Sequence, residues 1–297
     1  MFSINECNLC PHCCGVDRTV AKGICGVVGE KIKVARASLH MWEEPCISGE
    51  NGSGTIFFSG CSLGCIYCQN AVLSHKCIGK DVTIAELSEA MIRLQRQGAH
   101  NINFVTPTHY WLHLKEAVKL AKKSGLNIPI AYNTSGYERV EAIRELGDTI
   151  SIYLTDYKYA DENLARQFSA VADYDIFAFN ALKEMREQVG KPQYDQNGML
   201  QRGVLVRHLV IPGHIENSKK VLQKIYQAFG DDIIISIMNQ YTPLGNLPFN
   251  ELNRTLTEKE YDDIIDFAIR IGIKNAYIQD GETQKESFIP EFNGEGF

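Results

Sequence analysis

The chain has 297 residues, of which 44% are hydrophobic and 22% are charged, so it is long enough for one large α/β domain with a small appendage. No apolar run reaches membrane-spanning length and residues 1–10 do not resemble a signal peptide, so we expect no membrane association. A formal net charge of −6 without a basic run argues against nucleic-acid binding. Ten cysteines without a signal peptide indicate a reducing, cytoplasmic compartment, where clustered thiols bind metal.

Residues 1–50 form a cysteine-rich N-terminal extension with its own composition. Four of its cysteines follow the pattern C-x2-C-x2-C-C, and a fifth lies in a Gly-Ile-Cys-Gly segment; they are Cys7, Cys10, Cys13, Cys14 and Cys25. Because His12 is the one histidine nearby, an all-thiolate site for zinc or a second iron–sulfur cluster is favoured over a mixed site. The pattern leaves open which of Cys13 and Cys14 is a ligand, and whether the segment is a flap that binds no metal.

Residues 55–58 have the pattern of a buried strand, and a loop with Gly60 and Gly64 follows it. The loop carries three cysteines in a C-x3-C-x2-C pattern: Cys61, Cys65 and Cys68. Glycines lower the cost of the dihedral angles that let such a loop fold around one metal centre. A cubic iron–sulfur cluster is closed by four thiolates, so three leave one iron open for chemistry, as at catalytic zinc sites. A zinc loop or incidental buried thiols are the alternatives.

Strand and helix patterns alternate after this loop. Beyond residues 55–58 we expect strands at 101–106, 128–133, 150–156, 204–210 and 233–238, with a short further one at 275–279. We expect helices at 83–98, 111–124, 137–146, 162–168, 174–189 and 217–229, with a last one opening at 257. Thr-x-x-Glu capping boxes open the helices at Thr83 and Thr257. The remaining segments, 190–203 and 240–256, are expected to be loops.

Six strands interleaved with helices, without a hairpin signal, predict a parallel α/β sheet, either open or barrel-like. Active sites of such sheets lie at the carboxyl ends of the strands, and polar residues gather there. They include Thr106, Thr108, His109, Asn133, Thr134, Ser135, Asp156, Lys158, Arg207 and His208. Hydroxyl, Asn and Asp groups suit a ribose, and a Lys suits a carboxylate. Each residue alone is equally consistent with a cap or turn, and Thr134 or Ser135 is a candidate cap. Together they favour a site for a zwitterionic, ribose-bearing cofactor.

With Tyr67 as the aromatic residue before its third cysteine, the C-x3-C-x2-C loop resembles the signature of the radical S-adenosylmethionine (SAM) superfamily. The resemblance implies a [4Fe–4S] cluster on the three cysteines, with S-adenosyl-L-methionine on the open iron. One electron then releases a 5′-deoxyadenosyl radical that abstracts hydrogen from a substrate. The implied fold is a partial (βα)6 TIM-like barrel over residues 51–280, followed by a loosely packed C-terminal tail at 281–297.

Later segments resemble pyruvate formate-lyase activating enzyme and its relatives, the activators of glycyl radical enzymes. Residues 133–136 are similar to the family's Asp-Thr-Asn-Gly, residues 156–158 to its Asp-Leu-Lys, and residues 210–213 to its Val-Val-Pro-Gly. The resemblance spans roughly residues 54–245. It implies a SAM site that includes Tyr67, Asn133, Thr134, Asp156 and Lys158, with His208 and Ile211 as further candidates. It also implies a flavodoxin or ferredoxin as electron donor, and a glycyl radical enzyme or other protein as substrate.

Two segments depart from that family. Thr106-Pro107-Thr108-His109 stands where the family has Gly-Gly-Glu, so Thr106, Thr108 or backbone carbonyls are expected to hold the methionine amino group. Residues 70–82 are too short for the ferredoxin-like insertion of many activators. A small-molecule or peptide substrate is therefore an alternative. A non-enzymatic iron–sulfur electron carrier or zinc-binding module is another.

Overall fold

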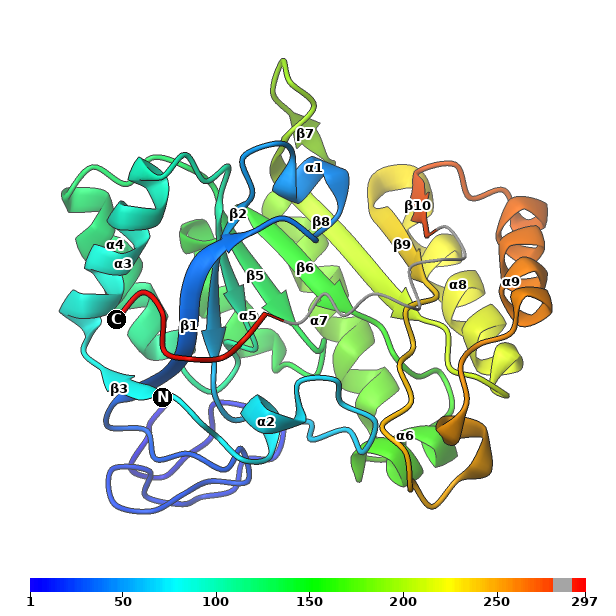
Figure 1. Ribbon diagram of the computed structural model, residues 1–297, viewed down its shortest axis with the longest axis horizontal. Helices are drawn as coiled ribbons and strands as arrows, with labels where there is room; N and C mark the ends of the chain where they lie inside the picture. Colours follow the sequence, from blue (N-terminus) through cyan, green and yellow to red (C-terminus); the bar gives the residue numbers. More distant parts are fainter. Residues whose placement is uncertain (280–289) are drawn as a thin grey trace.

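The computed structural model describes residues 1–279 and 290–297, and they fold around one mixed sheet (Figure 1). The strand order is β10-β9-β8-β6-β5-β4-β2-β1-β3, and β7 pairs with β8 outside this path. The strands are β1 Ile32–His40, β2 Ser53–Phe58, β3 Lys80–Val82, β4 Ile102–Val105, β5 Ile130–Thr134, β6 Ile152–Asp156, β7 Gln193–Tyr194, β8 Leu200–Leu209, β9 Ile234–Met238 and β10 Ala276–Ile278.

The six predicted strands are β2, β4, β5, β6, β8 and β9, and all of them run parallel. β10, expected as a short strand, extends the parallel set. The resulting open, mostly parallel sheet confirms the fold class, a partial TIM-like barrel with a cysteine-rich N-terminus.

The expectation of a sheet without antiparallel pairs is wrong at two places. β1 pairs antiparallel with both β2 and β3, so the sheet already begins inside the segment assigned to the extension. β7 and β8 form a hairpin within residues 190–203, which were expected to be a loop. The division into extension, barrel and tail stays a prediction.

Helices cover the outer face of the sheet, with α3 and α4 on one side and α8 and α9 on the other (Figure 1). They are α1 Pro45–Ser48, α2 Ala71–Ser74, α3 Ile84–Arg96, α4 Trp111–Lys123, α5 Val140–Leu146, α6 Glu162–Ser169, α7 Tyr174–Val189, α8 Ile215–Phe229 and α9 Glu258–Ile271, with short 3-10 turns at Gly147–Thr149, Gly230–Asp232 and Asn250–Asn253. Both predicted capping boxes are confirmed, at Thr83 and Thr257. No helix of the described residues is long and apolar enough to cross a membrane.

The short helix α1 closes the barrel at the amino ends of its strands. Its Cys46 and Ile47 are buried against a small interior cluster formed by Ala131, Ile152, Leu154, Leu200, Leu205 and Ile234. Figure 1 shows α1 at the end of the sheet opposite to the cysteine-rich loops of the N-terminus. The interior is therefore filled with apolar side chains at one end and left open at the other, where the strands end.

The last residues of the chain lie against β1. The N–H of Ala37 donates to the carbonyl of Glu295 (2.9 Å), and the N–H of Gly294 donates to that of Ala35 (3.0 Å). Arg36 also forms an ion pair with Glu295, at 2.6 Å. The expectation of a loosely packed tail is therefore wrong for residues 290–297, and residues 281–289 lie outside the described residues.

Candidate active site

A cavity of about 420 Å³ opens at the carboxyl ends of the parallel strands. Its walls come from the loop after β2, the ends of β4, β5, β6, β8 and β9, and the segment between β1 and α1. Eleven of the residues predicted from the sequence line it: Cys61, Cys65, Tyr67, Cys68, Thr106, Asn133, Thr134, Ser135, Asp156, Lys158 and Arg207. The structure thus brings the cysteine loop and the polar ends of four strands to one space.

The three thiols of the loop face this cavity. The hydroxyl of Ser169 donates to Cys65 Sγ (3.1 Å), and the N–H of Leu63 donates to Cys61 Sγ (3.4 Å). Burial, together with the neighbouring thiols, raises the pKa of Cys61 to about 12 and also raises that of Cys68. A bound metal reverses this effect, because ligation requires the thiolate and releases the proton.

These thiols suit a cluster better than a single ion. In the described part of the chain, no three His, Cys, Asp or Glu side chains are placed to hold one metal ion. A cubic cluster needs no such convergence, since each thiolate binds a different iron. Three thiols that border an open cavity therefore fit a [4Fe–4S] cluster with one iron free for another ligand.

The backbone of the loop requires its glycines, as predicted. Gly60 and Gly64 have φ angles of +88° and +60°. A Cβ atom on Gly60 would lie 2.6 Å from the carbonyl oxygen of Cys25, which is backbone that cannot move aside. The loop thus packs directly onto the N-terminal extension at this point.

Asp156 and Lys158 form an ion pair at the cavity wall, with Lys158 Nζ 2.5 Å from Asp156 Oδ2. Burial lowers the pKa of Lys158, but the Asp156 carboxylate and the thiols of Cys65 and Cys68 raise it by more, so the net direction is upward. The ammonium group therefore stays charged, and Asp156 fixes its position beside the thiols. A positive charge held this way suits a ligand carboxylate.

Thr134 is held from behind by a buried carboxylate. Its hydroxyl donates to Glu138 Oε1 (2.6 Å), which also accepts from Thr108 (2.5 Å) and Tyr132 (3.3 Å). Burial raises the pKa of Glu138 to about 7, and these hydrogen bonds oppose that rise. Thr108 consequently points into this network and does not line the cavity. The helix after β5 begins at Val140, so Thr134 and Ser135 do not cap it.

Thr106 lines the cavity with an unusual backbone. Its φ of +60° is rare for a β-branched residue, and its N–H donates to the carbonyl of Asn133 (2.9 Å). This is the conformation that glycine adopts most easily. Thr106 stands where the activating enzymes have Gly-Gly-Glu, and its backbone turn is of the type that a glycine would make.

Two weaker candidates, His208 and Ile211, do not line the cavity. Side chains of a strand alternate between its two faces, so Arg207 points into the barrel and His208 points away. His208 is fully buried, with Nδ1 2.7 Å from the carbonyl oxygen of Tyr157. Ile211 is a core residue that is 1% exposed.

Arg207 belongs to a charged group at the cavity floor that the sequence analysis did not identify. Its Nε lies 2.9 Å from Glu44 Oε1, and its Nη2 bonds both Glu43 and Glu44. Glu43 also accepts from Asn103 Nδ2 at 2.7 Å. Burial opposes ionisation of Glu44, but the charge and hydrogen bonds of Arg207 outweigh it and lower the pKa of Glu44. The sequence signal that could have indicated this charged group is the pair of adjacent acidic residues at positions 43 and 44.

Tyr67 and Gln69 fasten the cysteine loop to distant parts of the chain. The hydroxyl of Tyr67 shares a hydrogen bond with that of Tyr159 (2.7 Å). Gln69 Nε2 donates to the carbonyl of Gln240 (2.7 Å) and to the hydroxyl of Thr242 (3.0 Å). The start of the long loop after β9 is thereby held over the cavity.

A family model described as the radical SAM superfamily matches residues 55–188, which include the three thiols and every polar strand end up to Lys158. Residues 55–188, a little less than half of the chain, are thus similar to the radical SAM superfamily. The cofactors of this superfamily are a [4Fe–4S] cluster and S-adenosyl-L-methionine, and the donor set of the cavity fits both.

Curated relatives cover most of the chain. An uncharacterised protein of Methanocaldococcus jannaschii, MJ0674, is 27% identical over 283 residues, which is 92% of this chain and 77% of the relative. A pyruvate formate-lyase-activating enzyme of Clostridium pasteurianum is 23% identical over 218 residues, 72% of this chain and 82% of the relative.

Two solved structures share part of the architecture. Methylornithine synthase superposes with a TM-score of 0.48 at 17% identity over 73% of this chain, which spans 60% of that protein. A domain of a pyruvate-formate lyase-activating enzyme from Bacteroides vulgatus superposes with a TM-score of 0.39 at 18% identity, over 57% of this chain and 93% of that domain.

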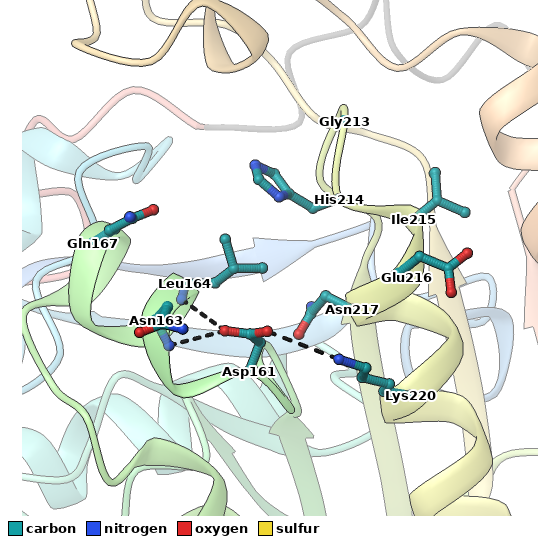
Figure 2. Close-up of a pocket in the computed structure, with 10 residues that line it drawn as sticks. All are labelled: Asp161, Asn163, Leu164, Gln167, Gly213, His214, Ile215, Glu216, Asn217 and Lys220. Carbon is teal, nitrogen blue, oxygen red and sulfur yellow. Dashed lines mark hydrogen bonds and ion pairs between the residues drawn. The ribbon is translucent and has the colours of Figure 1, made fainter.

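A second, more open pocket of about 400 Å³ lies between α6 and the start of α8 (Figure 2). Asp161 at its centre caps α6, accepting from the N–H groups of Asn163 and Leu164, and lies 3.9 Å from Lys220. Its central carboxylate is thus occupied by a helix cap, and no thiol lines the pocket. The radical SAM cavity is the better candidate for chemistry.

The cysteines of the N-terminal extension lie outside the radical SAM cavity but next to its loop. The N–H of Cys61 donates to the carbonyl of Cys25 at 3.0 Å. His12 Nε2 is 2.6 Å from the carbonyl oxygen of Ser62. All ten cysteines of the chain, which lie within the described residues, are free thiols.

Proposed function

We propose that the chain is a radical SAM enzyme that carries a [4Fe–4S] cluster on Cys61, Cys65 and Cys68 and binds S-adenosyl-L-methionine in the adjoining cavity. What carries the proposal is that these thiols border the same cavity as Asn133, Asp156 and Lys158. When bound, the cluster would supply the electron for reductive cleavage of the cofactor's sulfonium, and the cleaved cofactor would supply hydrogen-atom abstraction from the substrate.

Different side chains of the cavity bind different parts of the cofactor. Lys158, held by Asp156, pairs with the methionine carboxylate. Asn133 and Thr134 hydrogen-bond the ribose, and Glu138 fixes the hydroxyl of Thr134 from behind. Tyr67 packs beside the adenine.

The methionine amino group needs an acceptor that replaces the family's carboxylate. Thr108 does not line the cavity, so its hydroxyl is not the acceptor. Thr106 and the backbone carbonyls near it take this role, because Thr106 lines the cavity.

The substrate we favour is a glycyl radical enzyme or another protein. A flavodoxin or ferredoxin in the cytoplasm supplies the electron. The support is the relative from Clostridium pasteurianum, whose name is pyruvate formate-lyase-activating enzyme. A small-molecule or peptide substrate is the second candidate. It is supported by the charged floor of the cavity, where Arg207, Glu43 and Glu44 lie within the barrel.

The test is anaerobic reconstitution with iron and sulfide, followed by dithionite and S-adenosyl-L-methionine. We expect 5′-deoxyadenosine from the wild type, none from Cys65→Ala, and wild-type amounts from Cys77→Ala, which changes a cysteine outside the cavity. Iron incorporation without cleavage in the wild type would instead indicate an iron–sulfur electron carrier.

A further inference from the structure

Four of the five cysteines in the N-terminal extension gather around one point. Cys7 lies in the buried core of the chain, and Cys14 packs against that core. Cys25 is close enough to both of them for their charges to interact, and Cys10 is likewise close to Cys7 and Cys25. Cys7, Cys10 and Cys25 are only 4%, 8% and 6% exposed. Buried free thiols from segments 7–14 and 25 thus share one interior space.

Cys13 does not belong to this group. It is exposed, its φ is +42°, and its Sγ lies 3.5 Å from Arg139 Nη1 on the other side of the turn. Its N–H donates to the carbonyl of Cys10 (3.1 Å), which closes the turn between Cys10 and Cys14. The ambiguity between the neighbouring cysteines is therefore resolved by geometry in favour of Cys14.

Arg18 lies beside the four thiols as a buried cation without a counter-ion. It is 0% exposed, and its Nη2 has no hydrogen-bond partner among the described residues. Its other contacts are neutral: the carbonyls of His109 (2.8 Å) and Val27 (3.5 Å), and the ring of Tyr110. Among the cysteines, Cys14 and Cys25 are close enough for their thiolate charge to interact with Arg18. A buried charge is strongly destabilising unless it is paired.

We propose that Cys7, Cys10, Cys14 and Cys25 hold a [4Fe–4S] cluster with four thiolate ligands, because within the described residues no three thiols are placed to hold a single ion. The thiols lose their four protons to solvent as the cluster binds. Four thiolates around a [4Fe–4S]²⁺ core leave about two negative charges on the centre. This charge, next to Arg18, supplies the counter-ion that the guanidinium group otherwise lacks.

The centre braces the radical SAM loop. The carbonyl of Cys25, one of its ligands, accepts the hydrogen bond from the N–H of Cys61. Gly60 packs so closely against the same carbonyl that a Cβ atom would not fit there. His12, between Cys10 and Cys14, meets the carbonyl of Ser62. Metal binding in the extension therefore fixes the backbone from which the first thiol of the radical loop projects.

The experiment uses the full chain with Cys61, Cys65 and Cys68 replaced by Ala, so that bound metal reports the N-terminal site alone. After anaerobic supply of iron and sulfide, we expect about four irons per chain by elemental analysis. A parallel arm supplied with zinc alone tests for a single-ion site, and about one zinc per chain without any uptake of iron would contradict the cluster. Adding Cys14→Ser abolishes the metal, whereas the matched neighbour Cys13→Ser retains it.

Arg18→Gln tests the charge argument separately. We expect the metal to be lost to a chelator at least tenfold faster than from the parent chain, with an unchanged metal count before challenge. The visible absorption of the iron-loaded parent chain is the safeguard against a Cys14→Ser variant that does not fold. About four irons per chain with thiolate-to-iron and sulfide-to-iron charge-transfer bands support the site.

Three further results would overturn the proposal: no metal in either arm, equal loss of metal in Cys13→Ser and Cys14→Ser, or a Cys7–Cys14 disulfide in protein kept under anaerobic conditions. Because the radical cysteines are absent from the parent chain, failure here is independent of whether the radical SAM chemistry proposed above is correct.

Discussion

Replacing Arg207 with Met removes the one cation that offsets Glu43 and Glu44 at the floor of the barrel. The side chains of Arg207, Glu43 and Glu44 are 11%, 9% and 8% exposed, so solvent screens them little. Removing one partner of a buried ion pair costs about 3–5 kcal/mol, because the remaining charge is left unpaired. We expect Arg207→Met to lower the free energy of unfolding at pH 7 by that amount.

The pH dependence of this effect has a defined sign. In the wild type the folded-state pKa of Glu44 lies below its ordinary value, so its contribution is present at neutral pH and is lost as the pH falls through that pKa. Without Arg207, burial and the charge of Glu43 raise the folded-state pKa of Glu44 above the unfolded value. The folded variant then binds more protons, and its stability rises as the pH falls from 7 towards 5.

Urea unfolding at pH 7 and pH 5 measures both effects. The control is Arg144→Met, which breaks an ion pair with Glu184 in which Arg144 is 63% exposed, and we expect it to cost less than about 1 kcal/mol. A loss in Arg207→Met no larger than in this control, or one that grows on acidification, would refute the reasoning. Restoration of stability by Glu43→Gln together with Glu44→Gln would support it.

Three further predictions concern the cavity. Lys158→Met removes the cation placed for the methionine carboxylate, so the Kd for S-adenosyl-L-methionine should rise about tenfold or more by isothermal titration, with Asp156→Asn giving a smaller rise. Gly60→Ala should lose iron, because its Cβ meets backbone at 2.6 Å, whereas Gly98→Ala, also at positive φ but in open space, should keep its iron and lose only about 1–2 kcal/mol. Glu138 has its folded pKa raised to about 7, so wild-type stability should fall as the pH rises from about 4.5 through 7, and Glu138→Gln should flatten that profile in denaturant titrations.

The fold followed from the sequence wherever one segment carried its own signal. Apolar runs marked the strands β2, β4, β5, β6, β8 and β9, and the capping boxes at Thr83 and Thr257 marked two helices. β1 was missed although Ile32, Val34 and Leu39 are apolar, because the cysteine-rich segment was treated as one unit. The β7–β8 hairpin has an Asn-Gly pair at its turn, which is a recognised signal, but its strand β7 is only two residues long.

The residues of the candidate site could be predicted where they belong to a sequence motif. They could not be predicted where the packing of the chain determines which side chains reach the cavity. The cysteine loop, Asn133, Asp156 and Lys158 reach the cavity. His208 does not, since the alternation of β8 turns Arg207 inward in its place. The contact of Arg207 with Glu44 joins residues that are 163 positions apart, and only the folded sheet brings them together.

The most direct test of the central claim is the electron paramagnetic resonance spectrum of the reduced, reconstituted protein before and after addition of S-adenosyl-L-methionine. The wild type is compared with the Cys65→Ala variant, so that the difference between the two spectra isolates the cluster on Cys61, Cys65 and Cys68. The account predicts a reduced [4Fe–4S] signal that shifts when the cofactor binds the open iron. An unshifted signal, or a spectrum that already reports four protein ligands on the cluster, would contradict it.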